Sequence, residues 1–85
     1  MTETDAIRLF KCLSDKSRLQ ILKSLAIEDM YVERLAERLG ITAPTVSFHL
    51  KKLADAGAVV SYKSQYYTMY ALKKDIFKTS ILEIL

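Results

Sequence analysis

The sequence predicts a mainly α-helical domain that carries one small β-hairpin, and three observations predict this class. Apolar residues recur with helical spacing up to residue 56 and again from residue 73 onward. Between these stretches, two short runs are rich in β-branched and aromatic residues. The chain has 85 residues, 51% hydrophobic and 27% charged, which suits one small globular domain and excludes a disordered chain. We therefore expect residues 1–85 to form a single domain.

Two short helices are expected at the start of the chain. The first covers residues 6–13, and its apolar stripe has a spacing of three residues. That stripe consists of Ile7, Phe10 and Leu13. Ser14 and Asp15 then offer an N-cap for a second helix over residues 16–26, and the Asp15 carboxylate complements the helix dipole. The apolar set of the second helix is Leu19, Leu22 and Ala26, flanked by Ile21 and Leu25.

A helix-turn-helix is expected over residues 33–56, after a short strand or extended link at residues 30–32. Its first helix ends at Gly40, a residue suited to a left-handed C-terminal cap. Thr42 is a good N-cap for the second helix, and Pro44 lies in the first turn, where its missing N–H costs nothing. Gly57 closes the second helix. The residues expected to face inward, at i, i+4 and i+7, are Val46, Leu50 and Leu53.

The runs 58–63 and 66–72 are expected to pair as a hairpin with Ser64 and Gln65 at its tip. The hairpin tyrosines are expected to pack in the core and across the strands, except Tyr66 at the tip. A last helix, 73–85, carries more apolar surface than one face of a terminal helix needs. A helix-turn-helix followed by such a hairpin, or wing, makes a winged helix-turn-helix.

The second helix of the helix-turn-helix supplies most of the candidate DNA contacts. With its apolar residues facing inward, a step of about 100° per residue turns several polar residues and Phe48 outward. The N-terminal part of such a helix enters the major groove, where hydroxyls, methyls and aromatic faces contact base edges. Cations at its flank and at the wing tip suit phosphates. The candidates for DNA contact are Thr42, Ala43, Thr45, Ser47, Phe48, His49, Lys51, Lys52, Lys63, Ser64, Gln65 and Tyr66.

The charge distribution favours a polyanionic partner. Residues 1–40 carry seven basic and seven acidic side chains, whereas residues 41–85 carry six lysines against three acids. The whole net charge of +3 therefore lies in the second half, where Asp55 is the only acid between residues 41 and 72. An ordinary solvated face would give the same pattern.

These motifs resemble the ArsR-type (arsenic-repressor-like) bacterial transcriptional regulators. The resemblance covers residues 5–72 and is most specific from Pro44 to Gly57, which starts Pro-Thr-Val-Ser-Phe-His-Leu-Lys-Lys-Leu and ends Ala-Gly. It implies a sequence-specific regulator, acting as a repressor, that binds an inverted repeat in double-stranded DNA as a homodimer. It also implies a DNA-facing role for His49. Arg18 matches a family position, where we expect it to brace the fold.

In the family that the sequence resembles, the first and last helices form the dimer interface. The residues expected there are Ile7, Phe10, Leu13, Phe77, Ile81, Ile84 and Leu85. The alternative is that the last helix folds back over its own core. The chain ends on apolar residues, as a domain cut from a longer protein would, so continuation beyond Leu85 stays open.

No metal, cofactor or catalytic site is expected. The metal-binding Cys-Val-Cys known in this family is replaced by Tyr31-Val32-Glu33, and Cys12 has no second thiol. Cys12 is interpreted as a packing residue on the first helix. No paired carboxylates, phosphate-binding loop or catalytic triad pattern occurs, so no enzyme is expected. One cysteine, no signal peptide and no apolar run of membrane-spanning length predict a reduced, soluble, cytoplasmic protein.

Two other functions stay open at this point. The first is a winged-helix protein–protein interaction module without DNA binding, in which Phe48 would contact a protein instead of a base. The second is a regulator that senses a ligand or oxidant through Cys12. For the DNA-binding regulator itself, the sequence does not identify the effector.

Overall fold

The computed structural model describes residues 2–77 and has four helices followed by a two-stranded antiparallel hairpin. The elements are α1 (Glu3–Leu13), α2 (Lys16–Leu25), α3 (Val32–Leu39), α4 (Ala43–Asp55), β1 (Val59–Ser64) and β2 (Tyr67–Leu72). Of the helix expected over residues 73–85, residues 74–77 are helical and Lys73 is not, while residues 78–85 lie outside the described residues. The expected fold class, a mainly α domain with a winged helix-turn-helix, is confirmed.

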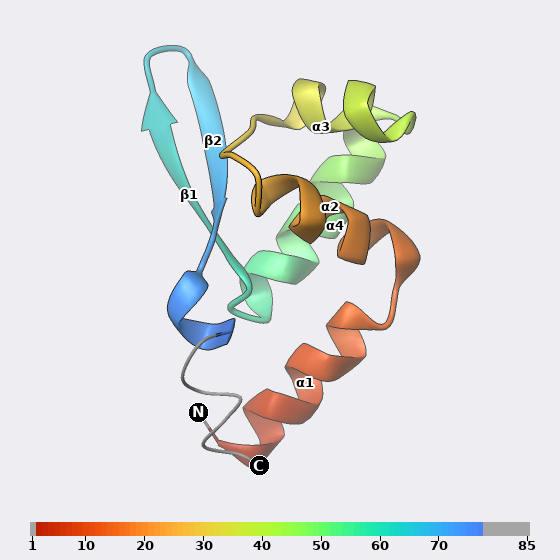
Figure 1. Ribbon diagram of the computed structural model, residues 1–85, viewed down its shortest axis with the longest axis vertical. Coiled ribbons are helices and arrows are strands. Elements are labelled where there is room, and N and C mark those ends of the chain that lie inside the picture. Colours follow the sequence, from red (N-terminus) through yellow and green to blue (C-terminus); the bar gives the residue numbers. More distant parts are fainter. Residues whose placement is uncertain (1, 78–85) are drawn as a thin grey trace.

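The helices form the body of the molecule, and the hairpin stands along one side of it (Figure 1). Helix α4 starts beside α3 and runs down to the start of β1, while α1 lies at the end farthest from α3 and from the tip of the hairpin. The wing tip and the N-terminus of α4 therefore lie toward the same end of the molecule. None of the helices described within residues 2–77 is long and apolar enough to cross a membrane.

Local caps explain where most helices begin. The Thr2 hydroxyl accepts a hydrogen bond from the Asp5 N–H (3.1 Å), and the Asp5 carboxylate accepts one from the Thr2 N–H (3.2 Å). This capping box starts α1 three residues earlier than expected. At α2 the Asp15 carboxylate accepts a hydrogen bond from the Arg18 N–H (3.0 Å), which confirms the predicted cap.

The link before α3 is only partly extended. Met30 forms an isolated antiparallel bridge with Tyr70, with backbone hydrogen bonds of 3.1 and 2.8 Å. Val32, which was also expected to be extended, is instead the first residue of α3. The bridge fixes the start of α3 against the edge of β2.

Glycines with positive φ end both helices of the helix-turn-helix, as predicted. Gly40 has φ +68° after α3, and Gly57 has φ +79° after α4. Beyond α4, the N–H groups of Gly57 and Ala58 donate to the carbonyls of Ala54 and Leu53 at 3.0 and 2.8 Å. This pattern satisfies the last carbonyls of the helix and turns the chain into β1.

One core lies between the helices and the inner face of the hairpin. The buried members of this core are Leu9, Ile21, Leu22, Leu25, Met30, Leu35, Val46, Leu50, Leu53, Ala58, Val59 and Ile76. The predicted inward residues of α4 are all among them. On α2 the predicted stripe has the wrong phase, because Leu19 is 49% exposed and Ile21 and Leu25 are buried. Ile21, Leu22 and Leu25 cluster within about 100° around the helix, with Leu19 outside that arc.

The hairpin turn is shifted by one residue from its predicted place. Ser64 pairs with Tyr67, so the turn consists of Gln65 and Tyr66, and Gln65 has φ +56°. The expectation that most hairpin tyrosines pack inside is wrong for Tyr62 and Tyr67, which are exposed, and right for Tyr70, which packs against the core.

Candidate nucleic-acid interface

The first half of α4 presents a polar and aromatic outer face. The Thr42 hydroxyl caps the helix by accepting a hydrogen bond from the Thr45 N–H (3.3 Å), and the two threonine hydroxyls lie 2.7 Å apart. Thr45, Ser47 and Phe48 are exposed, with Phe48 at 56%, and Ala43 is half-buried. A hydroxyl has one proton and two lone pairs, so Thr45 keeps bonding capacity for a base edge. The exposed side chains of this half match those that contact base edges in the major groove.

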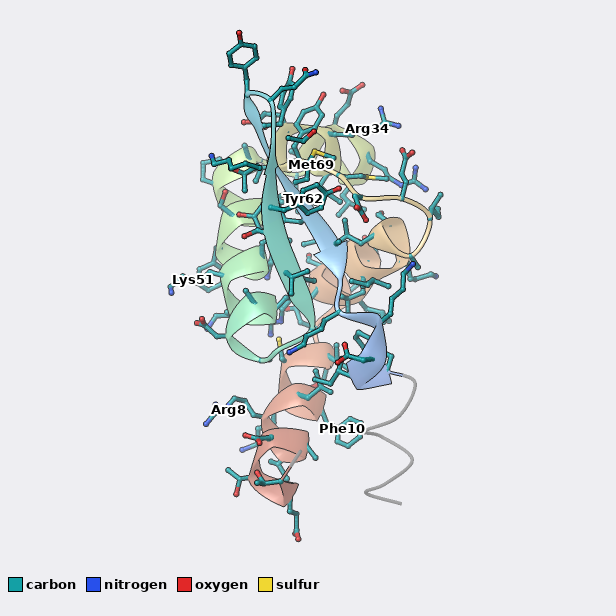
Figure 2. All side chains as sticks on the ribbon, turned by 90° about the vertical axis from the view of Figure 1, so that its left-hand side faces the viewer. Arg8, Phe10, Arg34, Lys51, Tyr62 and Met69 are labelled. Carbon is teal, nitrogen blue, oxygen red and sulfur yellow. The ribbon has the colours of Figure 1, made fainter. Side chains whose placement is uncertain are left out.

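The second half of α4 presents two lysines. Lys51 lies 3.7 Å from Asp55 in an exposed pair, and Figure 2 shows Lys51 pointing away from the body of the molecule. The Lys52 ammonium lies 5.0 Å from the centre of the Phe48 ring. An exposed ion pair and an exposed cation–π contact each contribute little to stability. Both ammonium groups can therefore exchange these partners for phosphates.

His49 does not lie at the surface, contrary to the expectation of a phosphate contact. Its side chain is 9% exposed, and its Nδ1 lies 3.3 Å from the Arg18 guanidinium. The ring also meets Phe48 edge to face, with centroids 5.5 Å apart. The packing of α2 against α4 covers His49, so its position fits a structural role better than contact with DNA.

Arg18 braces the fold, as expected. Its Nε donates to the Cys12 carbonyl at the end of α1 (2.7 Å), and its Nη1 meets His49 on α4. One side chain on α2 therefore connects α1 to α4. The hydrogen bond from the Arg18 N–H is also the main reason why the pKa of the Asp15 carboxyl lies below its usual value.

The wing tip is exposed throughout. The four candidate contacts there are Lys63, Ser64, Gln65 and Tyr66. Tyr66 is 96% exposed, and the Lys63 ammonium donates to the Thr68 hydroxyl across the strands (2.7 Å). The tip thus carries one cation and several hydrogen-bonding groups, which suits contact with a phosphate backbone.

Helix α1 has a second apolar face outside the core. Ala6 and Leu9 are buried, whereas Ile7 and Phe10 are 49% and 47% exposed. Phe10 projects from α1 on the side opposite to Arg8 (Figure 2). Of the other residues expected at a dimer interface, Leu13 and Phe77 are half-buried, and Ile81, Ile84 and Leu85 lie outside the described residues.

Cys12 is half-buried and packs against the core. Burial raises the pKa of its thiol, so the reactive thiolate is disfavoured. Across residues 2–77, no three His, Cys, Asp or Glu side chains lie close enough together to hold a metal ion.

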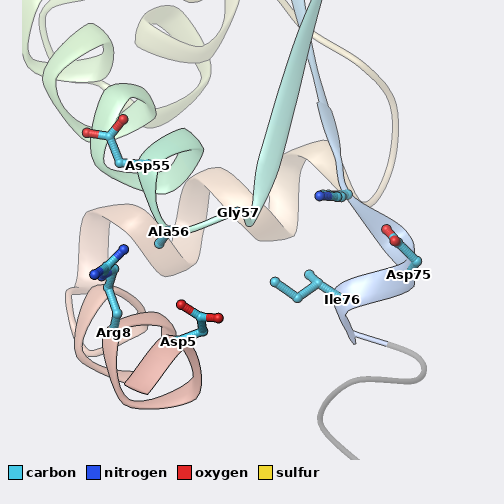
Figure 3. A pocket seen from close by; sticks show the side chains of 8 residues that line it. Asp5, Arg8, Asp55, Ala56, Gly57, Asp75 and Ile76 are labelled. Carbon is cyan, nitrogen blue, oxygen red and sulfur yellow. The ribbon is translucent and has the colours of Figure 1, made fainter. Parts of the chain in front are cut away.

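A hollow of about 330 Å³ lies between α1, the end of α4 and residues 73–76 (Figure 3). Its charged lining residues are Asp5, Arg8, Asp55, Lys73 and Asp75. These charges are of both signs, so the lining gives no clear selectivity for a cation or an anion.

One aromatic pair has no counterpart among the sequence-based expectations. Tyr31, before α3, stacks on Tyr67 of the wing with ring centroids 4.4 Å apart. No local signal marks this pair, because the two residues meet only through the bridge between Met30 and β2.

Comparisons with known proteins agree with this geometry. The profile of the family described as "Bacterial regulatory protein, arsR family" matches residues 15–61. The chain is similar to the HTH-type transcriptional regulator KmtR of Mycobacterium tuberculosis, at 35% identity over 91% of this chain, and spans 59% of the length of KmtR. It is also similar to the transcriptional repressor SdpR of Bacillus subtilis, at 32% identity over 86% of this chain and 81% of SdpR.

A solved structure shares the fold. It is the homodimeric winged helix-turn-helix DNA-binding domain of Mb0332 from Mycobacterium bovis, with a TM-score of 0.83 and 26% identity over 95% of this chain and 77% of that one. The family consists of regulatory proteins, in agreement with the expectation that the chain is not an enzyme. The profile covers more than half of the sequence, and the SdpR match covers most of both chains. The chain therefore belongs to the arsR family of bacterial regulatory proteins.

Proposed function

We propose that the chain is a sequence-specific, DNA-binding transcriptional regulator that acts as a homodimeric repressor. The observation that carries the proposal is the outer face of α4, where Thr45, Ser47 and Phe48 are exposed. The opposite face of this helix is buried in the core. In this proposal the first half of α4 enters the major groove, and the wing tip contacts the flanking backbone. Such a regulator would act in the cytoplasm.

The chemistry of each side chain decides whether it is proposed to contact a base or a phosphate. Thr45, Ser47 and Phe48 contact base edges, while Lys51, Lys52 and Lys63 contact phosphates. His49 is left out of the DNA contacts because it is buried against Arg18. The repressor role rests on the named relative SdpR, which is a transcriptional repressor.

The homodimer is proposed to form through α1. Its outward apolar residues Ile7 and Phe10 give a surface that a second copy would cover. The Mb0332 domain, which shares the fold, is homodimeric. A dimer would place two α4 helices on half-sites about one helical turn apart, so its operator is an inverted repeat.

Phe10→Glu tests this interface. The variant is expected to become monomeric in sedimentation, because a carboxylate in an apolar interface is left without a partner. The matched control is Ile27→Glu, since Ile27 is 67% exposed in the turn between α2 and α3. A Phe10→Glu variant that stays dimeric would contradict the proposed interface.

DNA binding itself is tested by fluorescence anisotropy with oligonucleotides selected from a random pool and with the DNA upstream of the gene. We expect binding to an inverted repeat that weakens steeply as salt rises, because cationic contacts release counterions. Absence of binding at low salt by a folded dimer would refute the proposal and favour the protein-interaction module, with Phe48 as its apolar contact.

A further inference from the structure

Four of the five tyrosines in the chain line one hollow between the wing and the start of α3. We call it the tyrosine hollow; it measures about 650 Å³. Its lining residues are Tyr31, Val32, Glu33, Tyr66, Tyr67, Thr68 and Tyr70. The fifth tyrosine, Tyr62, donates instead to the Asp29 carboxylate (2.5 Å) and does not line the hollow. The DNA-contact proposal uses only Tyr66, so it leaves most of this cluster unexplained.

The walls of the hollow are held in place, and their aromatic side chains stay partly exposed. The rings of Tyr31 and Tyr67 are stacked, with centroids 4.4 Å apart and planes inclined by 31°. The backbone bonds between Met30 and Tyr70 fix the start of α3 to β2. Tyr67 is exposed, and Tyr31 and Tyr70 are half-buried, so their rings remain accessible from solvent. A ligand that enters would meet aromatic surface that needs little rearrangement.

Glu33 gives the hollow its charge preference. It is the only charged residue in the lining and, in the described part of the chain, makes no ion pair. Its full negative charge outweighs the partial charge, about half a unit, of the α3 N-terminus. Lys63 approaches from β1, but its ammonium is bonded to the Thr68 hydroxyl (2.7 Å) and does not line the hollow.

No cation of the protein covers these rings. Within residues 2–77, the one ammonium or guanidinium group that lies over an aromatic ring is Lys52, and its partner is Phe48. Tyrosine faces beside one carboxylate are the elements that bind organic cations, since the ring quadrupole attracts a weakly hydrated positive charge. A metal ion is a poor match, because it needs several oxygen ligands and the hollow offers one carboxylate.

We propose that the tyrosine hollow binds a small organic cation of the quaternary ammonium class. Tyr66 belongs to both the hollow and the proposed DNA surface, and the hollow joins the wing to the helix-turn-helix. A bound cation would therefore alter how the wing meets DNA; this effector role rests on the proposed function, whereas cation binding does not.

The test uses choline and its uncharged carbon analogue, in which a tert-butyl group replaces the ammonium head. Binding is followed on the free protein by tyrosine fluorescence, which is not obscured because the chain has no tryptophan. Choline is expected to bind with about fivefold higher affinity than the analogue. Equal affinities, or no saturable change with choline, would overturn the proposal.

Variants locate the site. Glu33→Gln changes an exposed residue and is expected to abolish most of the preference for choline over the analogue. Tyr67→Leu is expected to weaken the binding of both ligands. Tyr62→Phe is the matched control outside the hollow and is expected to bind choline as the native protein does. Loss of binding in Tyr62→Phe with retention in Glu33→Gln would place the site elsewhere. A protein that binds choline but no DNA would refute the proposed function alone.

Discussion

Arg18→Met tests whether one side chain connects α1, α2 and α4. The change keeps much of the apolar stem and removes the guanidinium. Two hydrogen bonds are lost, one to the Cys12 carbonyl (2.7 Å) and one to His49 Nδ1 (3.3 Å). His49, only 9% exposed, then has no other partner for that nitrogen among the described residues and little access to water.

The expected loss in the free energy of unfolding can be estimated from these two hydrogen bonds. A hydrogen bond from a charged donor contributes about 1.5–3 kcal/mol, and the longer bond to His49 contributes toward the low end. Arg18 is half-buried, so partial solvation reduces the sum. We expect the free energy of unfolding to fall by about 2–4 kcal/mol, a large share of the roughly 4–13 kcal/mol available to a domain of this size.

Urea unfolding followed by circular dichroism measures this loss. The matched control is Arg34→Met, because Arg34 makes one ion pair with Glu28 (3.1 Å) in which both side chains are 53% exposed. Removal of such a pair costs about 0–1 kcal/mol. If the free energy of unfolding falls by the same small amount in Arg18→Met and Arg34→Met, Arg18 does not brace the fold.

Three further predictions concern a cap, a turn and a hydrogen bond. The backbone hydrogen bond that caps α2 holds the pKa of Asp15 low, so its stabilisation is present above about pH 4 and is lost as pH falls through the lowered value. Urea unfolding at acidic pH should therefore show a steeper loss for the native protein than for Asp15→Asn. Gln65→Gly should raise the free energy of unfolding by about 0.5–1 kcal/mol, because φ is +56° there, and Tyr66→Gly should not; equal effects would contradict the turn geometry. The hydrogen bond to Asp29 raises the pKa of Tyr62, so an absorbance titration should show one late-ionising tyrosine that disappears in Tyr62→Phe. This contribution to stability is lost as pH rises through the raised value.

The helix-turn-helix could be predicted from the sequence because its signals are local. Thr42 caps α4, Gly40 and Gly57 adopt positive φ where the helices end, and Val46 and Leu50 repeat at the helical period. Each of these signals lies within a few residues of the feature that it determines.

The errors in side-chain placement arise where distant segments meet, whereas the early start of α1 and the shifted hairpin turn are local. His49 lies at the flank of α4 by periodicity, but α2 packs over that flank and brings Arg18 to it. Leu19 fits an apolar spacing on α2, but it is exposed. The helix packs against α3, α4 and β2, and in that orientation Ile21 and Leu25 are buried instead. The stack of Tyr31 on Tyr67 depends on a tertiary bridge in the same way.

The most direct test of the central claim, that the outer face of α4 recognises DNA, compares Thr45→Ala with Lys51→Ala on the cognate operator and on random DNA. Lys51→Ala should weaken binding to both DNAs alike and lower the salt slope by about one unit. Thr45→Ala should cost about 1–3 kcal/mol at the operator and leave binding to random DNA unchanged. Equal losses on both DNAs for both variants, or no loss for either, would contradict the account.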